Sequence, residues 1–186
     1  MEWIPDYLQI AFDTLYALPP EEAAAAAAAG QAALEVLGMP PEECYCTLLF
    51  YAAHADGRWL CGHIGDGYIF RIRQDTAVVF SAPENGHAIN ETYFLSEPSA
   101  AQHLRIRSGE LHEPYAVLLT SDGGGDTLFD RQQQQPAHAV ERLCDWLTEN
   151  DEKTVTEALQ HVIKEKMIPA TEDDVSVAIL YCGEDE

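Results

Sequence analysis

Apolar residues in the first part of the chain recur at helical spacing. Residues 3–18 carry one apolar face at positions three and four apart, and Pro19-Pro20 ends that pattern because proline cannot continue a helix. Residues 21–37 follow with seven consecutive alanines, and alanine is the strongest helix former. We therefore expect two helices, which together make residues 1–38 a helical segment.

After residue 46 the pattern changes to short apolar and alternating runs, which are typical of strands. The runs at residues 47–51 and 59–64 flank an Asp-Gly turn, which predicts a β-hairpin. Two further runs cover residues 68–73 and 76–80, with short polar turns between them. The four runs together predict an antiparallel meander.

The second half of the chain begins with a stretch that has no sustained period. We expect residues 81–113 to form a long loop, with at most short strands near residues 92–95 and 103–107. The apolar run Tyr115–Thr120 then predicts a buried strand, and the glycine-rich residues 121–126 that follow it predict a sharp turn.

Two helices and a strand are expected at the end of the chain. Helical spacing predicts helices over residues 136–148 and 154–167, the second with a capping box formed by Thr154 and Glu157. An apolar run predicts a final core strand over residues 175–181. The order of elements indicates an α+β fold, a layered β-sandwich flanked by helices, in one domain spanning 1–186 whose sheet and helix layers cover 46–182.

Charge narrows the choice of partners. The 186 residues include 32 acidic and 10 basic side chains, and the formal net charge is −22. Such a surface repels nucleic acid and anionic membranes, so neither is expected as a partner. The chain has no apolar stretch long enough to cross a bilayer and no basic start typical of a signal peptide, so we expect a cytoplasmic protein.

Aspartates stand at three turns next to predicted strands. Asp66 lies between two glycines, Asp122 and Asp126 flank a triple glycine, and Asp173-Asp174 precedes the last strand. Mg²⁺ and Mn²⁺ prefer carboxylate oxygens, so these positions are candidate metal ligands. The simpler alternatives are ordinary Asp-Gly turn chemistry and, for Asp173-Asp174, an acidic pair that guards a hydrophobic strand against aggregation.

Four segments, in this order, resemble the metal-dependent type 2C protein serine/threonine phosphatases of the bacterial branch. The segments are Cys46-Thr47-Leu48-Leu49, Ile64-Gly65-Asp66-Gly67-Tyr68-Ile69, Leu118-Leu119-Thr120-Ser121-Asp122-Gly123 and Glu172-Asp173-Asp174-Val175-Ser176-Val177. The resemblance implies a phosphoprotein substrate and Mn²⁺ or Mg²⁺ at two or three sites. Carried over by position, it makes Asp122 and Asp173 ligands of one catalytic metal, and Asp66, Asp122 and Asp126 ligands of a third, weaker metal site.

The chain also departs from the family pattern. Asp174 stands where the family commonly has Asn, and neither the phosphate-binding Arg nor the metal-bridging Asp of the family is found before Trp3. No catalytic residue is therefore assigned. We expect an N-terminally incomplete phosphatase domain that is inactive or weakly active alone, and that self-associates or is completed by another chain because its sheets lack strands.

Three hypotheses about function follow from the sequence. In the first, the chain is part of a metal-dependent phosphatase that hydrolyses phosphoserine and phosphothreonine in proteins, and its first strands are missing. In the second, it is a non-catalytic relative that binds a partner or a metal without turnover. In the third, it is a generic acidic α+β domain whose Asp-Gly motifs are only turns.

Overall fold

The computed structural model describes residues 12–17, 19, 22, 38, 40, 45–84 and 92–183. The chain divides into two compact units, one of residues 1–65 and 84–112 and the other of residues 66–83 and 113–186. The helix expected over residues 21–37 lies almost wholly outside the described residues. Of the helix expected over residues 3–18, residues 12–17 are described; residues 12–16 are helical and Ala17 lies in a turn.

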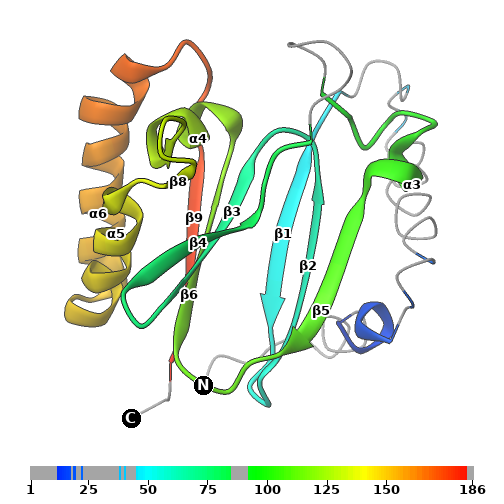
Figure 1. Cartoon of the computed structure of the whole chain (residues 1–186), viewed down its shortest axis with the longest axis horizontal. Coiled ribbons are helices and arrows are strands. Elements are labelled where there is room, and N and C mark those ends of the chain that lie inside the picture. Colours follow the sequence, from blue (N-terminus) through cyan, green and yellow to red (C-terminus); the bar gives the residue numbers. More distant parts are fainter. Residues whose placement is uncertain are drawn as a thin grey trace. The chain divides into compact units, whose positions relative to one another are not determined.

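The first unit contains a three-stranded antiparallel sheet in the order β1-β2-β5 (Figure 1). The strands are β1 (Leu48–Ala53), β2 (Arg58–Ile64) and β5 (Arg105–Glu110). The predicted hairpin is confirmed, because β1 and β2 pair in register from Leu48 opposite Ile64 to Ala53 opposite Trp59. The short helix α3 (Ala100–His103) precedes β5.

Strand β5 corrects the expectation of a long loop over residues 81–113, in which at most a short strand was expected near residues 103–107. Its sequence, Arg-Ile-Arg-Ser-Gly-Glu, is polar and weakly patterned, yet all six residues pair with β2. Gly109 lies directly against the Trp59 ring, where a Cβ atom would come within 2.7 Å of the ring atom Cζ2. The strand forms because β2 offers a backbone partner, and propensity alone does not report such non-local pairing.

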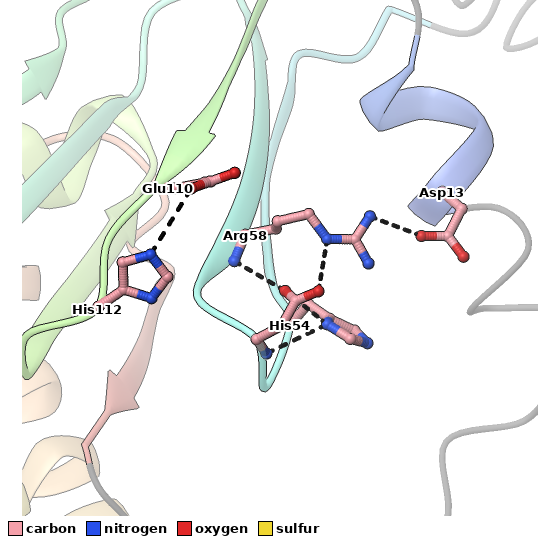
Figure 2. A network of polar contacts seen from close by, with 6 residues as sticks. Asp13, His54, Arg58, Glu110 and His112 are labelled. Atoms are coloured by element: carbon pink, nitrogen blue, oxygen red, sulfur yellow. Dashed lines mark hydrogen bonds and ion pairs between the residues drawn. The ribbon is translucent and has the colours of Figure 1, made fainter.

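An ion-pair network joins the tip of the β1–β2 hairpin to the helical turn at residues 12–16 (Figure 2). The Arg58 guanidinium bonds to Asp56 at 2.7 Å and to Asp13 at 2.9 Å. It also lies over the rings of Phe12 and Tyr16, with 5.4 and 5.3 Å to the ring centroids. Arg58 therefore holds this helical turn against the hairpin through both charge and cation–π contacts.

The second unit contains a four-stranded antiparallel sheet in the order β4-β3-β6-β9. Its strands are β3 (Tyr68–Arg73), β4 (Thr76–Ser81), β6 (Tyr115–Thr120) and β9 (Val177–Cys182). The predicted strand at residues 115–120 is confirmed, and the final strand begins two residues later than the predicted Val175.

The predicted four-stranded meander is wrong, because β2 and β3 belong to different sheets. The chain leaves β2 through Gly65, whose φ of 109° lies in the left-handed region that glycine tolerates. Strand β3 then pairs with β4 and with β6, which is about 45 residues further along the chain. Two hairpins, each completed by distant strands, replace the meander.

Helices cover the second sheet and build its core. They are α4 (Asp122–Leu128), α5 (His138–Glu149) and α6 (Glu152–Val162), and Figure 1 shows α5 and α6 next to the strands of this sheet. The two-residue strands β7 (Phe129–Asp130) and β8 (Gln135–Pro136) connect α4 to α5. The shared core comprises Phe70, Ile72, Ala116, Leu118, Leu128, Val140, Leu143 and Met167.

Helix α6 begins two residues before the predicted start. Its N-cap is Asp151, whose carboxylate accepts bonds from the Thr154 amide at 3.0 Å and the Thr154 hydroxyl at 2.9 Å. The predicted capping box at Thr154 and Glu157 is therefore wrong, because the acidic side chain three residues earlier makes the stronger cap. After Val162 the chain continues as a π-helical turn, η3 (Ile163–Met167), and a 3₁₀ turn, η4 (Ile168–Ala170).

Among the described residues, every helix is too short or too polar to span a lipid bilayer.

Candidate metal centre

Three strand termini of the second sheet meet at one end of the sheet. Strand β3 begins at Tyr68 opposite Thr120, where β6 ends, and Thr120 in turn lies opposite Val177, where β9 begins. Each sequence-predicted acid stands just beyond one of these termini. Asp66 precedes β3, Asp122 and Asp126 follow β6 on α4, and Asp173 precedes β9.

The glycines between Asp122 and Asp126 form part of α4 instead of the predicted sharp turn. Each lies against a neighbouring group. A Cβ atom on Gly123 would come within 2.8 Å of the Asp174 carbonyl, one on Gly124 would meet the Thr120 hydroxyl, and one on Gly125 would meet the Tyr68 ring. The triple glycine therefore permits close packing of the helix, which outweighs the low helix propensity of glycine.

Ser121 fastens the segment before β9 to the start of α4. Its hydroxyl donates to the Asp174 carbonyl at 2.9 Å and accepts from the Ser176 amide at 3.0 Å. The Ser121 amide and the Thr120 hydroxyl both donate to the Ser176 carbonyl, at 3.2 and 2.9 Å. Four hydrogen bonds thus fix the loop that carries Asp173 beside the helix that carries Asp122.

The carboxylates themselves have distinct partners. Asp122 accepts from the Gly123 amide at 2.8 Å. Asp126 accepts from the Thr171 hydroxyl at 3.4 Å and forms an ion pair with Arg131. The Asp173 amide donates to the same Thr171 hydroxyl at 3.2 Å, so Thr171 links the two acidic segments.

Asp126 and Asp173 face a common hollow of about 470 Å³, which Thr171 and Glu172 also line. Asp66 and Asp122 are not part of that lining. Across residues 45–84 and 92–183 and the few described residues before them, no three His, Cys, Asp or Glu side chains are grouped closely enough to hold a metal. The four acids share one end of the sheet, and their role as metal ligands stays a prediction.

Three polar side chains at this site were not predicted from the sequence. Ser121 was part of a quoted motif, but its double hydrogen bond depends on Asp174 and Ser176, more than 50 residues away. Thr171 and Arg131 lie in polar stretches without periodicity, and each contacts Asp126 through the fold. The sequence signal that could have found Ser121 is its place at the end of an apolar strand before a helix.

Comparison with known proteins decides the family. The family model described as protein phosphatase 2C matches residues 8–164, which is most of the chain. The chain belongs to the protein phosphatase 2C family. This membership confirms the family resemblance, and the match spans the first three of the four sequence segments.

Solved structures of bacterial phosphatases share the fold. The phosphatase domain of the cell fate determinant SpoIIE from Bacillus subtilis, in a Mn-presoaked form, has a TM-score of 0.54 at 15% identity, with 100% of this chain and 75% of that chain covered. PppA from Pseudomonas aeruginosa has 0.52 at 17%, with 91% and 75% covered. The serine/threonine phosphatase PstP from Mycobacterium tuberculosis has 0.55 at 14%, with 86% and 68% covered.

These likenesses confirm the predicted fold class, an α+β fold of the protein phosphatase 2C type. Among curated proteins, none gives a significant sequence match.

Proposed function

We propose that the chain acts in metal-dependent hydrolysis of phosphoserine and phosphothreonine in proteins. Asp122 and Asp173 would hold a catalytic Mn²⁺ or Mg²⁺, and Asp66 and Asp126 would contribute, with Asp122, to a weaker site. One observation supports the proposal most directly. In this member of the family, hydrogen bonds of Ser121 hold the loop that carries Asp173 against the helix that carries Asp122.

The residues present suit a hard divalent cation in their chemistry, although among the described residues no three of them are grouped closely enough to hold one as they stand. Carboxylate oxygens are the donors that Mn²⁺ and Mg²⁺ prefer, and the four acids lie at one end of one sheet. Asp126 and Asp173 border a hollow with room for a hydrated ion. The Mn-presoaked form of the Bacillus subtilis relative supports Mn²⁺ as the first metal to test.

A bound metal would supply a water of lowered pKa that can act as a nucleophile on phosphorus. The chain itself would hold the carboxylates in place. The Ser121 hydrogen bonds fix the spacing of the two acidic segments, and Thr171 orients Asp126 relative to the Asp173 backbone. Arg131 forms an ion pair with Asp126, and this ion pair must break before the Asp126 carboxylate is fully available to a metal.

Calorimetric titration with Mn²⁺ tests the metal site directly. We expect Asp122→Ala and Asp173→Ala each to weaken Mn²⁺ binding at least about tenfold, because each removes a charged oxygen donor. Glu149→Ala is the matched control, since Glu149 is an exposed acid at the end of α5. Equal binding by all four proteins would exclude Asp122 and Asp173 as ligands.

Hydrolysis of p-nitrophenyl phosphate and of a phosphothreonine peptide with Mn²⁺ then tests the phosphatase hypothesis. Turnover that is lost together with Mn²⁺ binding in Asp122→Ala supports the phosphatase. Tight Mn²⁺ binding without any turnover is expected of the non-catalytic relative and also of a phosphatase chain that is inactive alone, so only turnover distinguishes the two.

A further inference from the structure

A second cavity of about 460 Å³, which also has Asp126 in its lining, opens among α4, α5 and η3. Its walls include Leu143, Trp146, Val162 and Met167, and Leu143 and Met167 belong to the buried core, with 6% and 3% of their surface exposed. The cavity therefore reaches down to the core of the second unit. Its volume falls in the range of about 300–1,000 Å³ that is usual for small-molecule sites.

One face of α5 and the turn η3 supply the two sides of this cavity. Ala139, Arg142 and Trp146 recur on α5 at spacings of three and four residues, so they share one helical face. On the opposite side, Val162 and Lys166 are four residues apart. An indole ring and two aliphatic side chains offer contact area for an apolar group at low entropic cost.

Two cations, Arg142 and Lys166, line the cavity. Both are exposed, and in the part of the chain that the structure describes neither has an acidic partner within ion-pair distance. Five of the ten Lys and Arg side chains form ion pairs in the described part of the chain, and Arg142 and Lys166 are not among the five. The cavity thus brings two such cations together on a strongly negative protein.

Two acids near these cations have partners of their own. Asp126, the acid in the cavity lining, is paired with Arg131. Glu141, the neighbour of Arg142 on α5, accepts from His138 at 2.6 Å and from the Ala77 amide at 3.4 Å. These partners lower the pKa of Glu141, first through the His138 bond.

The backbone on the Lys166 side has an uncommon geometry. Residues Ile163–Met167 form a π-helical turn that interrupts the regular helix before Pro169. The wider turn places Lys166 beside the cavity while Met167, the next residue, stays buried in the core. Single π turns within helices are frequently found at functional sites.

We propose that this cavity binds a small carboxylate with an aromatic or aliphatic body. The body would pack against Trp146 and Leu143, and the carboxylate would bond to Arg142 and Lys166. An apolar wall selects against strongly polar ligands, and two cations that pair with no acid in the described part of the chain select against neutral ones. The cavity and the metal-centre hollow share Asp126 and Ala170, so the ligand would lie beside the candidate metal centre. The binding itself does not depend on the proposed phosphatase activity.

Paired calorimetric titrations test the proposal with 1-naphthaleneacetate and its uncharged amide, 1-naphthaleneacetamide, which has nearly the same shape. We expect the acid to bind at least about tenfold tighter than the amide, because only the acid uses the cations. Arg142→Gln and Lys166→Gln should each bring the acid's affinity toward that of the amide. The control Lys164→Gln, at an exposed lysine outside the cavity lining, should leave both affinities unchanged.

A cavity-filling variant, Ala139→Trp, should remove binding of both compounds while keeping the circular dichroism spectrum and the cooperative melt. The proposal is overturned if acid and amide bind equally, if neither binds at millimolar concentration, or if Lys164→Gln weakens the acid as much as Lys166→Gln does. Unchanged binding by a folded Ala139→Trp variant would also overturn it, because the ligand would then sit elsewhere.

Discussion

Replacing Gly124 by alanine tests how closely α4 packs against the end of β6. The new Cβ atom would collide with the Thr120 hydroxyl and would lie 3.2 Å from the Thr120 Cβ and 3.5 Å from the Ser176 carbonyl oxygen. The Thr120 hydroxyl cannot move freely, because it donates to that carbonyl at 2.9 Å. The clash therefore falls on the junction that holds the two acidic segments together.

Two opposing effects set the size of the change. Alanine is favoured over glycine inside a helix by about 1 kcal/mol, whereas overpacking of a tight contact costs about 1–3 kcal/mol. If packing dominates, Gly124→Ala lowers the free energy of unfolding by up to about 2 kcal/mol. Thr120→Ala alone should cost about 1 kcal/mol through its lost hydrogen bond.

A double-mutant cycle separates these effects by urea denaturation. In Thr120→Ala the obstructing hydroxyl is gone. Adding Gly124→Ala should then stabilise the protein by about 1 kcal/mol, the difference in helix propensity between alanine and glycine. The coupling between the two sites should be about 1–3 kcal/mol. A coupling energy of zero would refute the close packing of α4 on Thr120. So would an increase in the free energy of unfolding when Gly124→Ala is made in the wild-type protein.

Two further predictions concern His63 and Asp151. The pKa of His63 is lowered to about 4, first by burial and then by the charge of Arg105. Between pH 6.5 and 4 the unfolded chain binds a proton that the folded chain does not, so we expect about 2–3 kcal/mol of stability to be lost by pH 4.5. Urea unfolding at pH 7 and 4.5 measures this loss, and an equal loss in His63→Gln would contradict it. Asp151→Ala should lower the thermal midpoint of unfolding, because it removes the hydrogen bonds to Thr154. Thr156→Ala, at an exposed position on α6, is the control and should lower the midpoint less. Equal midpoints of the two variants in calorimetry would argue against Asp151 as the cap.

The sequence predicted the elements whose burial leaves a local pattern. The hairpin of β1 and β2 and the strand β6 were found because their apolar runs are short, dense and bounded by turn residues. Strand β5 was foreseen only as a short strand near residues 103–107, because its residues are polar and its full length comes from pairing with β2. The cap of α6 was misplaced because two neighbouring stretches carry capping residues, and only the observed bonds to Asp151 distinguish them.

The sequence by itself determined the family, and the four turn aspartates beside apolar strands that it offers as metal ligands remain a prediction. The tertiary structure decided how they are arranged. Antiparallel pairing brings the termini of β3, β6 and β9 to one end of a sheet, and the Ser121 hydroxyl fastens segments more than 50 residues apart. The ion pair of Arg131 with Asp126 and the cavity beside Arg142 likewise arise from packing. A local pattern reports which side chains are buried, whereas which buried surfaces meet depends on contacts between distant residues.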